Sequence, residues 1–138
     1  MKRSLSQHLK TDIGGEALAM IKTDSTIKIG LYLQTQELHG KRLRFNSDMK
    51  VVRKSNIDIL VFPEFAWFPF IREFRNASLE KEADRQSIFA LVSELSRNIG
   101  RAVVISNEDS NGLIVSMYAN AQAEGDDTQT AFYIKHTM

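Results

Sequence analysis

Hydrophobic residues fall into two kinds of pattern along the chain. Short, apolar and often β-branched runs bounded by turn residues predict five strands. These runs cover 27–34, 57–62, 101–106, 113–123 and 130–135. Between the first three runs, apolar residues recur at helical spacing in 41–55 and 78–99, which predicts two amphipathic helices. The order strand, helix, strand, helix, strand predicts a parallel α/β layer, which two further strands extend.

The second predicted helix carries the clearest local signals. Its apolar residues recur three or four positions apart from Ile88 to Ile99. Ser78 fits the N-cap, because its hydroxyl can accept a hydrogen bond from the first turn. Gly100 fits the position just beyond the last turn, where a left-handed residue commonly ends a helix.

The first 25 residues give a weaker pattern. Leu5, Leu9 and Ile13 recur at helical spacing, which allows a short helix. The mixed polar composition instead favours a flexible leader, and we prefer that interpretation. The chain is therefore divided into a leader, 1–25, and one domain, 26–138.

Composition is that of an ordinary soluble globular domain. The hydrophobic fraction is 43% and the charged fraction 25%, and 138 residues suffice for one domain. The net charge of +1 gives no reason to expect nucleic acid or an anionic membrane as a partner. No apolar run is long enough to span a bilayer, and none follows the basic start as in a signal peptide. The expected location is the cytoplasm.

Cysteine is absent from the sequence. Disulfides, thiolate zinc sites and a thiol nucleophile are therefore excluded within this chain. The three histidines show no metal-ligand spacing, and the acidic pairs fall in turns, where acidic residues are common. No glycine-rich phosphate loop follows a predicted strand. We therefore expect neither a metal ion nor a cofactor.

Two charged residues at strand ends are candidates for chemistry. Glu64 follows the second strand and Pro63, at the carboxyl end where open α/β sheets bind ligands. The aromatic residues after it would form an apolar wall, which favours the neutral acid and suits a general base. Lys135 ends the last strand and could stabilise a developing oxyanion. Each is alternatively a solvated residue at a strand end.

Three parts of the chain carry short motifs: residues 27–34, residues 58–64 (DILVFPE), and residues 118–121 followed by Gly125 and 133–136. In that order they resemble the opening strand, the glutamate motif, and the Tyr-Asn, Gly and Tyr-x-Lys block of the nitrilase superfamily of carbon–nitrogen hydrolases. The motifs follow one another in the family's order over nearly the whole chain. This order, rather than any single motif, carries the resemblance.

The resemblance implies a triad of glutamate, lysine and cysteine. Glu64 would be the general base, and Lys135 would stabilise the tetrahedral intermediate. The cysteine would attack a small amide or nitrile and form a thioester. Phe65, Trp67 and Phe68 would line the substrate pocket, or else pack as ordinary core and loop residues. In the family the cysteine lies well downstream of the lysine, so we expect this chain alone to be inactive.

The family fold is a four-layer sandwich of helix, sheet, sheet and helix. The resemblance implies one half of it, a truncated carbon–nitrogen hydrolase domain whose mixed sheet has two main helices on one face. The continuous apolar runs at 57–62 and 101–106 need cover on both faces. We therefore expect a homodimer or a complementing second half. The alternative functions are a non-catalytic ligand-binding or protein-interaction module, and a generic α/β domain with an accidental likeness.

Overall fold

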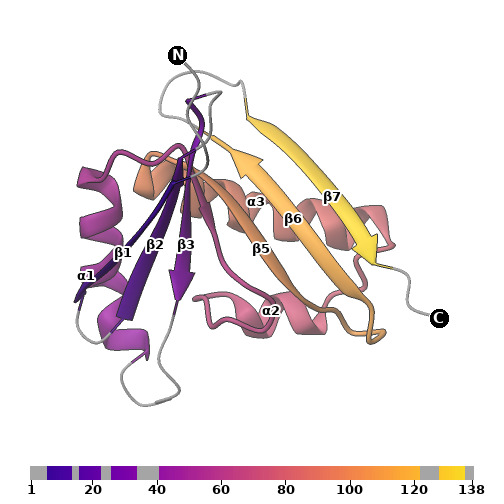
Figure 1. The fold of residues 1–138 in the computed structure, drawn as a ribbon. Coiled ribbons are helices and arrows are strands. Elements are labelled where there is room, and N and C mark those ends of the chain that lie inside the picture. Colours follow the sequence, from indigo (N-terminus) through magenta and orange to yellow (C-terminus); the bar gives the residue numbers. More distant parts are fainter. Residues whose placement is uncertain (1–5, 14–15, 23–25, 34–40, 122–127, 136–138) are drawn as a thin grey trace.

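The computed structural model describes residues 6–13, 16–22, 26–33, 41–121 and 128–135. Within these ranges the strands are β1 (Ser6–Ile13), β2 (Glu16–Lys22), β3 (Lys28–Leu33), β4 (Ile59–Val61), β5 (Ala102–Glu108), β6 (Ile114–Asn120) and β7 (Gln129–Lys135). The helices are α1 (Lys41–Lys54), α2 (Ile71–Asn76) and α3 (Glu82–Ile99) (Figure 1).

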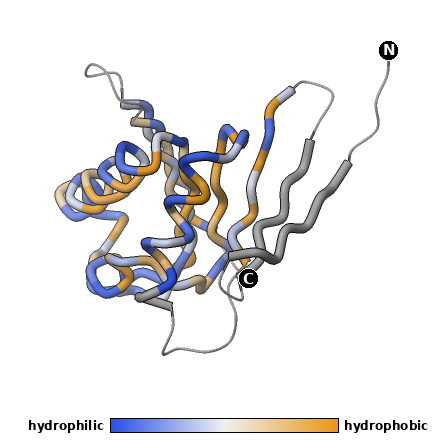
Figure 2. The backbone as a smooth tube through the Cα atoms, turned by 90° about the vertical axis from the view of Figure 1, so that its left-hand side faces the viewer, coloured by the Kyte–Doolittle hydropathy of each residue, from blue (hydrophilic) through white to orange (hydrophobic). Residues whose placement is uncertain are grey.

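The strands form one mixed sheet in strict sequence order, from β1 to β7. β3, β4 and β5 are parallel to one another, and every other neighbouring pair is antiparallel. α1 connects β3 to β4, and α2 with α3 connects β4 to β5. Both crossovers place their helices on the same side of the sheet (Figure 2). The predicted fold class, a mixed α/β sheet with its main helices on one face, is confirmed.

The helices agree with the predicted ones except at two places. Gly100 ends α3 in the left-handed conformation, with φ 65°, as predicted. Ser78 is not the N-cap: α3 begins later, and the Asp84 carboxylate accepts a hydrogen bond from the Ser78 backbone N–H at 2.8 Å. α2 follows the aromatic residues 65–70, in a segment for which the sequence analysis predicted no helix. Within the described ranges, no helix is long and apolar enough to cross a membrane.

The N-terminal segment is a correction to the sequence prediction. The helix allowed by the spacing of Leu9 and Ile13 is wrong, because β1 and β2 are antiparallel strands and β2 pairs with β3. Leu5 lies outside the described residues. Ile13 pairs with Glu16, and the two residues between them in the sequence are glycines. Gly-Gly between two strand-like runs is a hairpin signal, which the helical spacing concealed.

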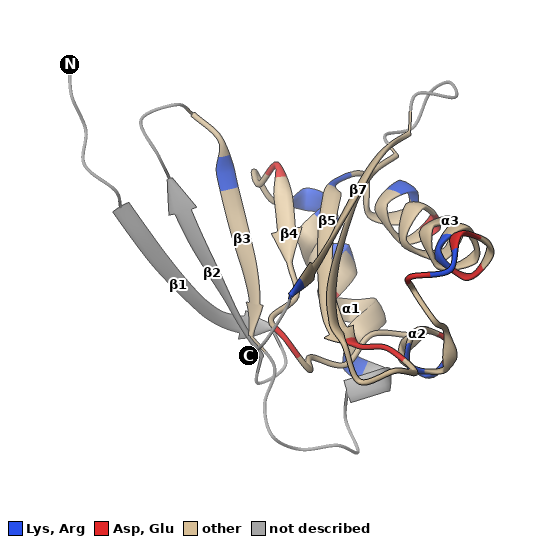
Figure 3. Cartoon of the chain, turned by 90° about the vertical axis from the view of Figure 1, so that its right-hand side faces the viewer, with Lys and Arg blue, Asp and Glu red and all other residues tan. Residues whose placement is uncertain are grey.

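The two faces of the sheet differ in cover. One face packs against the helices, and its side chains are at most 1% exposed in the central strands: Leu60, Phe62, Val103, Ile105, Val115 and Met117. The other face, called the open face here, carries the alternate residues of each strand. Its members in β3–β7 include Ile29, Leu31, Ile59, Val61, Val104, Ser106, Ser116, Tyr118 and Tyr133. Among the described positions of β3–β7, charges on this face stand only at strand ends, Glu108 and Lys135 (Figure 3).

One buried carboxylate fixes the turn between β5 and β6. Asp109 is 4% exposed, and its two oxygens accept hydrogen bonds from three backbone N–H groups. These belong to Leu79 at 3.1 Å, Asn111 at 2.9 Å and Leu113 at 3.0 Å. The turn and the start of the α3 segment are thereby held together, at the edge of the sheet where β5 ends.

Candidate functional site

Glu64 and Lys135 lie at the same edge of the sheet. β7 is antiparallel to β6, and β6 is antiparallel to β5, so β7 runs in the same direction as β4 and β5. The carboxyl ends of β4 and β7 therefore lie at the same edge of the sheet (Figure 3). Glu64 follows β4 by three residues, and Lys135 is the last residue of β7. Both side chains are exposed to solvent.

The loop that carries Glu64 is held against β5. The Phe62 N–H donates to the Val104 carbonyl at 2.9 Å, which continues the parallel ladder past the end of β4. The Phe65 N–H then donates to the Ser106 carbonyl at 3.3 Å. Glu64 stands between these two anchors. The backbone before and after Glu64 is therefore hydrogen-bonded to β5. The Glu64 carboxylate is exposed and can contact a ligand.

Cross-strand pairing aligns residues of β5, β6 and β7 in one row that begins at the Glu64 loop. Ser106, which accepts from Phe65, pairs with Ser116, and Ser116 pairs with Tyr133. Lys135 stands two residues beyond Tyr133 on the same face of β7. Three strand spacings, roughly 14 Å, separate the Glu64 loop from β7 along the sheet. Within the described residues no ion pair joins Glu64 to Lys135, so the two charges flank the row between them.

The row between the charges carries two hydroxyls in contact. The Ser106 and Ser116 Oγ atoms are 2.7 Å apart, and Ser106 is 9% exposed. One hydroxyl donates to the other, which leaves one O–H free to donate to a ligand. A hollow of about 160 Å³ lies beside them, lined by residues that include Val104, Tyr118 and Tyr133. The part of the open face between the Glu64 carboxylate and the Lys135 ammonium group is therefore apolar and carries hydroxyl groups.

The three aromatic candidates after Glu64 have different surroundings. Phe65 is 59% exposed. Trp67 is half-buried, and its ring meets the Phe45 ring edge-on at 5.6 Å between centroids. Phe68 is fully buried and packs edge-on against three other phenylalanines. Phe65 therefore offers the largest surface to a substrate, whereas Phe68 fills the core, which is the packing alternative left open by the sequence.

The predicted apolar wall around Glu64 is not formed by these rings. Glu64 is exposed, while Phe68 and Phe70 turn into the core between the sheet and the helices. Sequence reasoning also missed Ser106 and Ser116 as neighbours of the site, whereas Tyr133 belongs to the motif at 133–136 that was quoted with Lys135. The signal was present as polar residues at alternate positions of otherwise apolar strands. Within the described ranges, no group of three histidine or acidic side chains lies close enough to hold a metal ion.

Phe65 has an unfavourable backbone conformation. Its φ is 66°, in the left-handed region where a bulky side chain is rare. Thr26, at the other end of the sheet, is the other non-glycine residue with positive φ in the described chain. Strained residues of this kind tend to gather at functional sites, where the surrounding structure maintains them. Here the strained residue directly follows Glu64.

A glycine at this position tests the strain. The free energy of unfolding of Phe65→Gly is expected to be about 1 kcal/mol higher than that of Phe65→Ala, because glycine has no Cβ to oppose a positive φ. Comparing glycine with alanine removes the contribution of the ring, which both variants lack. Urea denaturation measures the difference. A glycine variant that is less stable than the alanine variant would show that the left-handed conformation is not adopted.

Comparison with known proteins adds no family assignment. No model of a known protein family matches the chain, and no curated protein matches its sequence. The interpretation of the site therefore depends on its geometry, together with the motif resemblance described above.

Proposed function

We propose that this chain supplies the glutamate and lysine of a carbon–nitrogen hydrolase site of the nitrilase or amidase type. One observation carries the proposal: Glu64 and Lys135 stand at one edge of the sheet, on either side of a row of hydroxyl groups. Glu64 serves as the general base, and Lys135 stabilises the negative oxygen or nitrogen of the tetrahedral intermediate. The substrate is a small amide or nitrile.

The nucleophile has to come from outside this sequence, since the chain contains no cysteine. A thiol attacks the amide carbon, and Glu64 takes the thiol proton. The carbon–nitrogen bond then breaks, the proton passes to the leaving amine, and water hydrolyses the thioester. The open face is where a second sheet can bring such a thiol to Glu64 and Lys135. By this proposal the chain alone is inactive, and its cytoplasmic location stays a prediction.

A cysteine placed on the open face tests the electrostatics of the proposed site. Ser116 lies diagonally opposite Lys135 across the β6–β7 pair, within reach of a long side chain. In Ser116→Cys the thiol is the only one in the chain, and a nearby ammonium group favours its reactive thiolate form. Its alkylation by iodoacetamide at neutral pH is expected to slow roughly threefold when Lys135→Ala is added.

The matched controls test whether the change in alkylation rate comes from the charge of Lys135 near position 116. Lys135→Arg should preserve the alkylation rate of Ser116→Cys, because the charge is retained. Ser87→Cys, exposed on α3, should react at a rate that Lys135→Ala leaves unchanged. A parallel assay of ammonia release from amides and nitriles should show no turnover by the wild type. Turnover that is lost in Glu64→Gln would support the site and contradict the inactivity of the isolated chain. An alkylation rate indifferent to Lys135 would contradict the proposed site.

A second candidate function is a non-catalytic binding module, favoured by the apolar open face. A homodimer in which two open faces stack, or a complementing second half, would cover that face and give a sandwich of two sheets between two helical layers. Stabilisation of the chain against heat by amides or nitriles, without turnover in any preparation, distinguishes this module from the hydrolase.

A further inference from the structure

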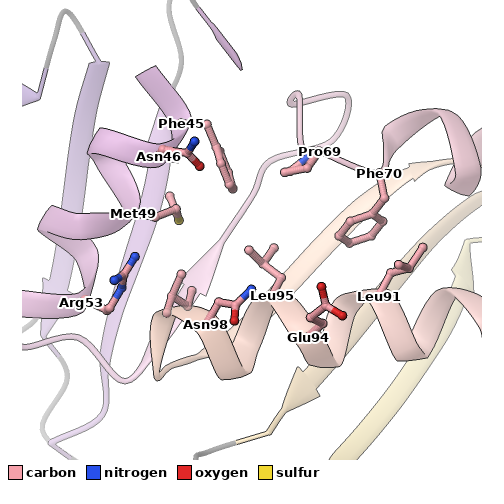
Figure 4. Close-up of a pocket in the computed structure, with 11 residues that line it drawn as sticks. Phe45, Asn46, Met49, Arg53, Pro69, Phe70, Leu91, Glu94, Leu95 and Asn98 are labelled. Carbon is pink, nitrogen blue, oxygen red and sulfur yellow. The ribbon is translucent and has the colours of Figure 1, made fainter. Parts of the chain in front are cut away.

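β7 carries exposed apolar side chains at one edge of the sheet (Figure 1). Phe132 is 42% exposed and Tyr133 is 66% exposed. A hollow of about 460 Å³ between α1 and α3 offers less apolar surface, because its floor includes Phe45, Met49 and Leu95, which are at most 7% exposed (Figure 4). A partner would therefore find apolar contacts at the β7 edge rather than between the helices.

The outer side of β7 also presents unused backbone groups. β7 pairs with β6 from Gln129 to Lys135, and within the described residues no strand or loop pairs with its other side. In an antiparallel strand, alternate residues direct their N–H and C=O groups to opposite sides. Half of the backbone groups of this strand, which spans about 23 Å, therefore face outward. A row of such groups is what an added strand satisfies.

The two edges of the sheet differ in their protection against such pairing. Proteins commonly guard an edge strand with charges, proline or a β-bulge. The sequence of β1 includes Lys10 and Asp12, and its pairing with β2 shifts register between Lys10 and Ile13. β7 (QTAFYIK) has neither a proline nor a register shift, and its one charge is the last residue. The β7 edge is thus open to another strand along its length.

α3 holds the middle of β7 in place. The Phe132 ring meets the Phe89 ring edge-on at 6.3 Å between centroids. The Arg85 guanidinium lies over the Phe132 ring, 4.4 Å from its centroid, and donates to the Leu79 and Glu80 carbonyls at 3.1 and 3.3 Å. Within the described residues no carboxylate forms an ion pair with Arg85. The edge is therefore preorganised, with a positive charge beside its middle residue.

That charge favours the strand of another protein over a second copy of this chain. If two β7 edges paired antiparallel about a two-fold axis, Phe132 would face Phe132, and each copy would bring its Arg85 to the axis. The two guanidinium groups would then lie within roughly 10 Å of each other and repel. A different strand can instead place a carboxylate opposite Phe132, where it meets Arg85.

We propose that the outer side of β7 binds an extended segment of a partner protein as an eighth, antiparallel strand. Backbone hydrogen bonds hold that strand, and an acidic residue opposite Phe132 pairs with Arg85. The side chains on its two faces cover the exposed parts of Phe132 and Tyr133. An added strand lengthens the sheet without covering the open face, so the proposal is independent of the hydrolase function and of the homodimer.

The test uses labelled seven-residue peptides of alternating threonine and valine with a glutamate at the fourth position. One peptide is N-methylated at its odd positions and one at its even positions, so each can pair along one side only. A third is N-methylated throughout. Fluorescence anisotropy at low salt measures binding to the wild-type chain. The fully methylated peptide is expected to bind at least tenfold more weakly than the better of the other two, because it can donate no backbone hydrogen bond to β7.

The glutamate of the tighter peptide is expected to lie on the α3 side. Its affinity should then fall roughly fivefold in Arg85→Gln. Arg72→Gln removes the same charge from an exposed position on α2, beside β5, and should leave binding unchanged. A version of this peptide with glutamine in place of glutamate should bind wild type and Arg85→Gln equally. The comparison among the methylated peptides uses wild type alone, so it does not depend on how the variants fold.

Amide exchange followed by NMR locates the bound strand. Alternate amides of β7 should exchange at least about tenfold more slowly with saturating peptide, whereas the amides of β1 should be unaffected. The proposal is overturned if neither singly methylated peptide binds, if the fully methylated peptide binds as tightly, or if β7 exchange is unchanged. Protection of these amides that rises with chain concentration in the absence of peptide would identify a second copy as the occupant, and would overturn it as well.

Discussion

Phe68→Ala is expected to lower the free energy of unfolding by about 3 to 5 kcal/mol. The Phe68 ring is fully buried between the sheet and the helices. It packs edge-on against Phe62, Phe70 and Phe74, at 6.5, 4.9 and 5.7 Å between ring centroids. Truncation to alanine removes these contacts and leaves a cavity that the strand and helices can fill only in part. A domain of this size has about 5 to 15 kcal/mol of stability, so the loss is a large part of it.

The neighbouring loop residue Phe65 provides the matched control. Its ring is 59% exposed, so Phe65→Ala should change the free energy of unfolding by less than about 0.5 kcal/mol. Urea denaturation followed by fluorescence measures both variants, because Trp67 is the single tryptophan and packs against Phe45. A cost below about 1 kcal/mol for Phe68→Ala would contradict the placement of its ring in the core.

Val61→Glu is expected to convert the proposed homodimer into monomers. Val61 lies near the middle of the open face, between Leu31 on β3 and Val104 on β5. If a second open face stacks on this one, the substitution buries a carboxylate among apolar side chains. That burial costs several kcal/mol unless the charge is paired. Dimer dissociation should therefore become at least about a hundredfold easier.

Light scattering after size exclusion measures this change. The wild type should elute as a dimer, and Val61→Glu as a monomer with an unchanged circular dichroism spectrum. Ser87→Glu, which adds the same charge to an exposed position on α3, should remain dimeric. A wild type that is monodisperse and monomeric at every concentration would contradict the proposal that a second copy of the chain covers the open face.

The regular elements were predictable because their periodicity is strong. The continuous apolar run from Ile57 to Phe62 reflects a strand with two apolar faces. The helical spacing in 82–99 reflects a helix that buries one face. Since three predicted strands alternate with helices, and a helical crossover returns the chain to the edge where the previous strand began, their parallel orientation could be predicted. That order also placed Glu64 at a carboxyl edge. The antiparallel strands that bring Lys135 to the same edge were predicted as strands, but their pairing came from the structure.

The remaining features depend on contacts between residues distant in sequence. α2 is six residues long and follows Pro69 in an aromatic segment, so it shows no helical period of its own. Asp84 satisfies the Ser78 N–H from inside the helix, which reverses the direction that an N-cap rule assumes. Whether Phe65 or Phe68 turns inward depends on how the loop docks on β5. Neither residue type nor spacing distinguishes the two.

The strict sequence order of the strands has a consequence for how the chain reaches this fold. Every strand pairs with its immediate predecessor, so each pairing closes a segment no longer than one crossover. Contacts of short sequence separation favour rapid folding, and the sheet can extend strand by strand as the polypeptide is synthesised. Glu64 is then in position before β7 has been made. The apolar open face is also presented to water from the moment β3, β4 and β5 are joined, so the partner proposed to cover it would protect the chain during synthesis as well as afterwards.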